Sequence, residues 1–243
     1  MKYLRIFLIG VWFIWFHIVG LFGVLILLPF LIIFSSRGSW FLYFFQLMKI
    51  WSWIVLKAMG FCYKIEYEEK LNPSKQYIFC PNHVSFIDIP LAVLCLQNIP
   101  TTFVGKAEAA RYPVFGYFYS RTMVLVDRSD PVSRKNVFAS AKKKLDDNHS
   151  ICIFPEGKIP EYKTKLHPFK NGAFSLAIER GIEIVPISFL DNKKLMPDKK
   201  YKGNPGLLRA YVHKPIKTTS YNKKDIETLK EKTYKIIYNK LYR

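Results

Sequence analysis

An uncharged apolar run near the start of the chain constrains its fold more than any other feature. From Ile6 to Phe34 there is no Asp, Glu, Lys or Arg, and His17 and three glycines interrupt the run. About 20 apolar residues suffice to cross a bilayer as an α-helix. The run is too long for the apolar part of a signal peptide, and the residues from Ser35 to Gly38 make a poor cleavage site. We therefore expect an uncleaved membrane anchor rather than the buried helix of a small soluble core.

A second apolar stretch, residues 40–61, differs from the first because Lys49 and Lys57 lie within it. These lysines share one helical face and have aromatic residues around them, a pattern typical of an interfacial helix. The polar cluster Ser35–Ser39 predicts a turn between the stretches. The two helices could form a hairpin that enters one leaflet, or one span followed by a surface helix. The even distribution of Lys and Arg does not decide between these arrangements.

The net charge of +19, from 37 Lys and Arg against 18 Asp and Glu, implies an anionic partner. Nucleic acid, a membrane surface and an anionic substrate are the three classes to consider. Lysines and tyrosines interleave from Lys193 to Arg243, but they form no recognisable nucleic-acid motif, and a chain tethered to a bilayer is a poor candidate for that role. We expect no nucleic-acid partner, and a basic face turned toward anionic membrane lipids.

The four cysteines show no C-x-x-C spacing; they are Cys62, Cys80, Cys95 and Cys152. This spacing disfavours a disulfide scaffold and a zinc site, and it favours reduced thiols in a cytosolic environment. We therefore expect a protein of the inner (cytoplasmic) membrane whose functional site faces the cytoplasm.

After residue 60 the pattern changes to strands that alternate with helices. Expected strands cover residues 62–68, 76–80, 101–105, 123–126, 151–154, 184–189 and 207–213. Expected helices cover residues 89–96, 106–111, 114–120, 131–145, 171–180 and 223–241, with a long polar loop at 156–168. This alternation predicts an α/β fold, with a mostly parallel mixed sheet flanked by helices and the membrane-embedded helical segment before it. We expect residues 1–60 and residues 61–243 to form two parts of different function.

His83 and Asp88 flank one tight turn between an expected strand and an expected helix. Pro90 is tolerated only in the first turn of a helix, so that helix begins near Asp88. A carboxylate that accepts the Nδ1–H of His83 would leave Nε2 free as a base, able to deprotonate a hydroxyl that attacks an activated carbonyl. The residues alone leave two alternatives open: Asp88 could be a helix N-cap, and His83 could be a solvated loop residue.

The run from Asn82 to Pro90, with its N-H-x₄-D pattern, resembles the first block of the glycerolipid acyltransferase family, which includes 1-acylglycerol-3-phosphate acyltransferases. Four further blocks resemble the family's in the same order: Val104-Gly105-Lys106-Ala107-Glu108 with Pro113 and Gly116, then Val126-Asp127-Arg128, Phe154-Pro155-Glu156-Gly157 with Phe169-Lys170-Asn171-Gly172-Ala173, and Val185-Pro186-Ile187. The resemblance covers roughly residues 61–215 and identifies residues 61–243 as an acyltransferase domain.

The resemblance implies a role for each matching residue. His83 would activate the acceptor hydroxyl and Asp88 would orient it. Arg128 would bind a phosphate, although a surface pairing with Asp127 or Asp130 is the alternative. Glu156 and Gly157 would line the acceptor site. Lys106 and Lys170 are further candidates for substrate binding, against the alternative of solvated lysine. These are expectations from motif position, supported by the suitability of a guanidinium for phosphate.

One block departs from the family pattern. The family usually continues Glu-Gly with Thr-Arg, whereas this chain continues with Lys158-Ile159-Pro160. Lys158 is the candidate to restore the positive charge, and the acceptor headgroup is the property that this departure puts in question.

The implied reaction is transfer of an acyl group from acyl-CoA or acyl-carrier protein to lysophosphatidate. It needs no metal or cofactor, because a thioester is already activated. The alternatives are another lysophospholipid or lyso-aminolipid as acceptor, and a non-catalytic protein that binds membrane surfaces.

Overall fold

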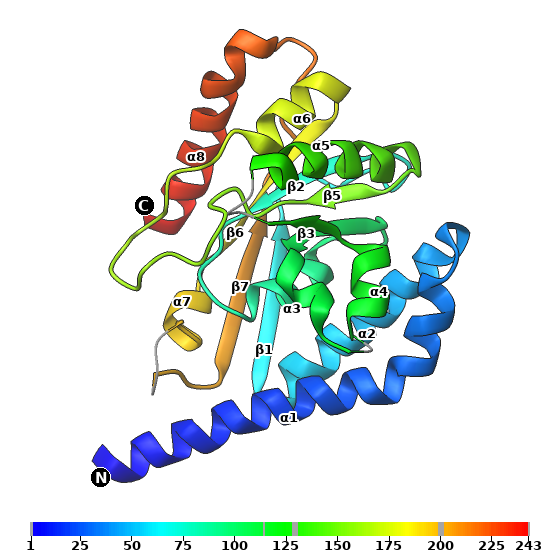
Figure 1. Cartoon of the computed structure of the whole chain (residues 1–243). Helices are drawn as coiled ribbons and strands as arrows, with labels where there is room; N and C mark the ends of the chain where they lie inside the picture. The colour runs from blue at the N-terminus through cyan, green and yellow to red at the C-terminus, as the bar shows by residue number, and fades with distance from the viewer. Residues whose placement is uncertain (1, 114, 128–130, 199–201, 243) are drawn as a thin grey trace.

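The computed structural model of the chain describes residues 2–113, 115–127, 131–198 and 202–242. It begins with two long helices, α1 (Lys2–Ser35) and α2 (Phe41–Ala58), joined through a short 3₁₀ helix, η1 (Gly38–Trp40). Figure 1 shows α1 along one edge of the molecule and α2 turning back beside it. Both predicted helices and the turn between them are therefore present.

The two faces of α1 differ in what they contact. Large apolar side chains are exposed on one face; they include Leu4, Phe7, Leu8, Val11, Ile14, Ile18, Leu21, Phe22 and Leu25. Their spacing of three to four residues places them on one side of the helix. The opposite face packs on α2, where the Trp51 Nε1–H donates to Gly20 O at 3.1 Å. Two helical segments are long and apolar enough to cross a membrane, Tyr3–Ser35 and Gly38–Ala58. This criterion uses length and composition alone, and the buried core helix of a soluble protein also meets it.

Helix α2 is part of the main hydrophobic core as well as a partner of α1. Its Phe45 and Leu56, and Met59 just after it, are buried in the same cluster as Leu91 of helix α3 (Asp88–Cys95). Lys49, which the sequence placed on an interfacial face, donates from Nζ to Asn98 Oδ1 at 2.7 Å. The first 60 residues are therefore packed directly onto the remainder of the chain.

The sheet has seven strands in the order β1-β7-β6-β2-β5-β3-β4. Their bounds are β1 (Phe61–Tyr67), β2 (Tyr77–Pro81), β3 (Thr101–Lys106), β4 (Val124–Val126), β5 (Ser150–Cys152), β6 (Glu183–Phe189) and β7 (Gly206–Val212). Neighbouring strands are parallel except for β6 and β7, which are antiparallel. This is the mostly parallel mixed sheet that the alternation of strands and helices predicts.

Helices cover both faces of the sheet (Figure 1). On the face of α1 and α2 lie α3, the 3₁₀ helix η2 (Ala107–Arg111) and α4 (Phe115–Thr122). On the other face lie α5 (Pro131–Asp146), α6 (Gly172–Arg180) and, after the 3₁₀ turn η3 (Lys223–Asp225), α8 (Ile226–Tyr242). A short helix that the sequence did not predict, α7 (Asn192–Leu195), follows β6. It has only four residues, too few for a periodic pattern.

Candidate active site

Four of the sequence-predicted residues lie at or after the carboxyl ends of β2, β3 and β5: His83, Asp88, Lys106 and Glu156. Strands β6, β2, β5, β3 and β4 are mutually parallel, so their carboxyl ends meet at one edge of the sheet. The chain leaves β2 through α3 on one face and leaves β5 through α6 on the other, toward opposite ends of the sheet (Figure 1). In open α/β sheets, ligands bind at such a switch point, outside the carboxyl ends of the strands.

The carboxylate of Asp88 is fully buried and all its described partners are hydrogen-bond donors. Oδ2 accepts the Nδ1–H of His83 at 2.9 Å, together with the backbone N–H groups of Val84 at 2.5 Å and Ser85 at 2.8 Å. Oδ1 accepts the Nδ2–H of Asn192 at 2.7 Å. A buried carboxylate needs such donors, because burial without them is costly. The N-cap of α3 is Ile87 and Asp88 is the first helical residue, so the N-cap alternative is wrong.

The imidazole of His83 is fixed from two sides. Asp88 holds Nδ1, and the ring of Phe154 stacks on the imidazole with centroids 4.2 Å apart. The His83 side chain is 15% exposed, so Nε2 is the nitrogen that a substrate can reach. With Nδ1 donating to a carboxylate, Nε2 carries the lone pair, which is the tautomer that a general base requires.

Glu156 links the loop after β5 to the loop after β2. Its buried carboxylate accepts the backbone N–H of His83 at Oε1, at 2.6 Å, and the backbone N–H of His167 at Oε2, at 2.9 Å. Burial raises the pKa of Glu156 to about 7, against the opposing effects of the two N–H donors and of the charge on Lys193. Glu156 therefore braces the backbone that carries His83, a contact that motif position alone did not reveal.

Gly157 has a left-handed backbone with φ of +75°, and a Cβ there would lie 2.8 Å from Lys170 Cε. A side chain at this position would meet both the strained backbone and the stem of Lys170. The backbone N–H of Lys170 donates to Pro155 O at 2.8 Å, which closes the loop on itself. The structure thus places Lys170 against Pro155 and Gly157.

The other predicted cations are less engaged. Lys106, at the end of β3, and Lys158 are exposed, and neither forms an ion pair with a carboxylate among the described residues. Arg128, the predicted phosphate ligand, lies outside the described residues.

Several contacts at the site come from residues outside the sequence motifs. Asn192 contacts Asp88 from a position 104 residues away, and the Ser85 hydroxyl donates to Met196 O. Phe189 N–H donates to Asn82 Oδ1 at 2.7 Å, which ties the end of β6 to the start of the His83 turn. A buried asparagine after a strand is a common turn residue, so no sequence pattern indicates this role.

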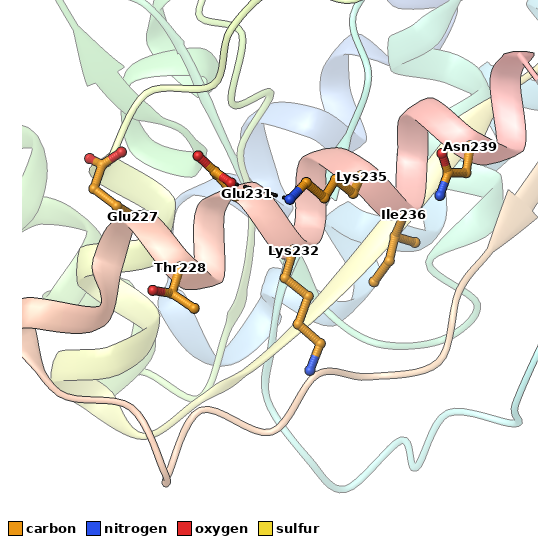
Figure 2. Close-up of a pocket in the computed structure, with 7 residues that line it drawn as sticks. All are labelled: Glu227, Thr228, Glu231, Lys232, Lys235, Ile236 and Asn239. Atoms are coloured by element: carbon orange, nitrogen blue, oxygen red, sulfur yellow. Dashed lines mark ion pairs between the residues drawn. The ribbon is translucent and has the colours of Figure 1, made fainter.

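The pocket in Figure 2 lies elsewhere, along the outer side of α8. Its lining residues are Glu227, Thr228, Glu231, Lys232, Lys235, Ile236 and Asn239. They belong to one helix and include an ion pair between Lys235 and Glu231, 3.4 Å from N to O. None of the site residues above lines it. Across residues 2–113, 115–127, 131–198 and 202–242, no group of three or more His, Cys, Asp or Glu side chains could hold a metal ion.

Comparison with known proteins decides the family. The family described as Acyltransferase matches residues 62–190, more than half of the chain. The chain belongs to the acyltransferase family. That match contains the His83 turn, Glu156 and Lys170.

Three similar curated proteins share one name. The chain is 33% identical over 146 residues to a 1-acyl-sn-glycerol-3-phosphate acyltransferase of Chlamydomonas reinhardtii, covering 59% of this chain and 43% of that protein. It is 30% identical over 197 residues to the chloroplastic enzyme of that name from Brassica napus, covering 77% and 54%. It is 28% identical over 165 residues to the Helicobacter pylori enzyme of that name, covering 66% and 69%. The chain thus spans about half the length of the Chlamydomonas and Brassica relatives.

A solved structure shares the fold. The crystal structure of the 1-acyl-sn-glycerophosphate acyltransferase PlsC from Thermotoga maritima aligns with a TM-score of 0.77 at 19% identity. The alignment covers 99% of this chain and 96% of that one, so the fold similarity includes the two N-terminal helices.

Proposed function

We propose that this protein transfers an acyl group from an acyl thioester, acyl-CoA or acyl-carrier protein, to the sn-2 hydroxyl of 1-acyl-glycerol-3-phosphate, giving phosphatidate. The observation that carries the proposal is the hydrogen-bonded pair of His83 and Asp88, 2.9 Å apart, at the carboxyl edge of an acyltransferase-family sheet. The names of the similar curated proteins support the acceptor.

The geometry suits general-base catalysis of acyl transfer. Nε2 of His83 accepts the proton of the acceptor hydroxyl as its oxygen attacks the thioester carbonyl carbon. The tetrahedral intermediate then collapses, the carbon–sulfur bond breaks, and the imidazolium returns the proton to the leaving thiolate. Asp88 holds the ring and stabilises the imidazolium, as in the serine-protease triad. Base catalysis of this kind contributes about 10²–10⁴ in rate.

Binding of the acceptor is the second element of the proposal. The candidates that line the acceptor site remain Glu156, Gly157, Lys158, Lys106 and Lys170. Arg128 remains the proposed phosphate ligand by motif position, because a planar guanidinium suits a phosphate.

The N-terminal helices are proposed to hold the protein on the cytoplasmic membrane, with the site facing the cytoplasm. Residues 1–60 would be the anchoring part and residues 61–243 the acyltransferase domain. The exposed apolar face of α1 supports this, since large apolar surfaces mark sites that water does not cover. Alkaline carbonate and high salt should leave the full-length protein in the membrane fraction. Release by salt alone would show that charge rather than insertion anchors it.

A second acceptor class has one observation in its favour. Lys158-Ile159-Pro160 stands where the family usually has Thr-Arg, and Lys158 is exposed. Another lysophospholipid, or a lyso-aminolipid, would fit a site with a different cation arrangement. Mass spectrometry of the lipids formed from a mixture of lyso-lipids, with each donor in turn, decides the question. We expect phosphatidate, and a different product would replace the proposed acceptor.

A further inference from the structure

Two lysines meet over one tyrosine ring beside the loop that carries Glu156. Lys193 Nζ lies 5.8 Å and Lys202 Nζ 5.2 Å from the ring centroid of Tyr162. Lys193 Nζ also donates to Thr164 O. Neither lysine forms an ion pair with a carboxylate of the described part of the chain. Both ammonium groups add to the positive potential at this ring, which favours an anion bound beside it.

Lys193 follows directly after a residue that contacts the pair of His83 and Asp88. Its neighbour Asn192 is buried and donates to Asp88 Oδ1 at 2.7 Å, so the start of α7 is attached to the carboxylate that orients His83. The charge on Lys193 also lowers the pKa of Glu156, whose Oε1 accepts the backbone N–H of His83. The ammonium group is thus within electrostatic reach of the site.

Lys193 differs from its neighbour in solvation. Its side chain is half-buried and burial lowers its pKa, whereas Lys194, the next residue of α7, is exposed. A half-buried ammonium has lost part of its hydration, and within the described residues Thr164 O accepts one of its three N–H donors. The remaining donors are available to a ligand, and a charged acceptor would compensate the lost hydration best.

We propose that Lys193, assisted by Lys202, binds the phosphate monoester of the acceptor lipid. The inference rests on the proposed function and assigns two residues to its acceptor site. A phosphate monoester carries about 1.5 to 2 negative charges at neutral pH, which matches two ammonium groups. A phosphodiester or a carboxylate carries a single charge, and a headgroup without phosphate carries none. Lys193 would share this role with Arg128 and Lys158, which remain the candidates from motif position.

Binding and turnover should be measured separately in the full-length protein in detergent micelles. The probes are 1-acyl-glycerol-3-phosphate and, as a phosphate-free control of the same acyl chain, 1-acylglycerol. Lys193→Met keeps an apolar side chain of similar length and removes the charge. Lys194→Met is the matched control, because it removes one charge from the adjacent exposed position of the same helix.

Without acyl donor, Lys193→Met should bind 1-acyl-glycerol-3-phosphate about tenfold more weakly than wild type, since a partly buried charge partner is lost. Lys194→Met should bind as wild type does, and binding of 1-acylglycerol should be unchanged in both variants. Lys193→Arg should recover most of the affinity. With acyl donor, the loss should appear in KM for the phosphate-bearing acceptor and not in kcat.

Equal affinity of Lys193→Met and Lys194→Met for 1-acyl-glycerol-3-phosphate would overturn the assignment, as would an equal loss for both probes. Lys202→Met provides a second test, because that exposed side chain has little part in folding; it should weaken binding about threefold, and no change would remove it from the site. If the wild type bound the phosphate-bearing probe but did not acylate it, the proposed function would fail while the binding site stood.

Discussion

The loop after β2 and the loop after β5 meet at the same edge of the sheet but are held in different ways. In the first, Asp88 collects three donors from its own turn, His83 among them. In the loop after β5, Glu156 is buried, but the chain beyond Gly157 carries exposed lysines. Hydrogen bonds from residues distant in the sequence hold that part of the loop. Tyr234 of α8 donates to Leu166 O from 68 residues away. The loop of the proposed chemistry is therefore held mainly by contacts within its own turn, with Glu156 and Asn192 as distant supports, whereas the loop proposed to bind the acceptor depends more on the tertiary fold.

The largest expected effect comes from removing the proposed base in the loop after β2. His83→Ala should lower kcat by about 10²–10⁴ because it removes the general base. The fold should survive, since the side chain of His83 is partly exposed. Steady-state turnover and urea unfolding of the detergent-solubilised protein measure the two quantities. Near wild-type turnover in His83→Ala would refute the proposed mechanism.

Asp88→Asn extends this test to the orienting residue. An amide cannot accept all the donors that surround the carboxylate, so turnover should fall heavily and stability should fall as well. The matched comparison is Asn192→Ala, which removes only the donor to Oδ1. It should reduce turnover less than Asp88→Asn does.

An intermediate effect is expected from Glu156, in the second loop. Burial raises the pKa of Glu156 in the folded protein to about 7, while the unfolded chain ionises near the ordinary value of 4.5. The folded state thus retains a proton that the unfolded chain has released, so this contribution to stability is complete below pH 4.5 and is lost as the pH rises to about 7. The size is on the order of 3 kcal/mol.

The measurement compares the free energy of unfolding of wild type and Glu156→Gln from pH 4.5 to 8. The difference between the proteins isolates Glu156 from other titrating groups, such as His149 and His213, whose pKa values burial lowers to about 4. The wild type should lose stability relative to the variant as the pH rises to about 7, and the difference should then level off. A difference that does not vary with pH would show that Glu156 titrates normally.

The smallest effect should come from the far end of the second loop. Tyr234→Phe removes only the hydroxyl that donates to Leu166 O, and it should lower the free energy of unfolding by about 0.5–1.5 kcal/mol. Tyr238→Phe is the control, because no hydrogen bond of its hydroxyl occurs within the described residues. If α8 helps to hold the acceptor loop, KM for the acceptor should rise in Tyr234→Phe alone. Equal behaviour of the two variants would limit α8 to a role in general stability.

The same contrast explains how much could be predicted from the sequence. The strands, most helices and the pairing of His83 with Asp88 were predicted, because each depends on residues close together in the chain. The role of Asn192 was not, since a contact over 104 residues leaves no local pattern. The strand predicted at 151–154 ends earlier, at Cys152, as the chain approaches Pro155, which has no backbone N–H to continue a ladder.

The packing of α2 bears on how a soluble form of this protein could be made. Phe45 and Leu56 cover the apolar side of α3, so a chain cut at residue 60 would expose that surface and would be expected to aggregate. Polar substitution of the outward residues of α1, such as Phe7 and Leu21, leaves this interior intact. Redesign of one helix face is therefore a better route to a detergent-free protein than truncation.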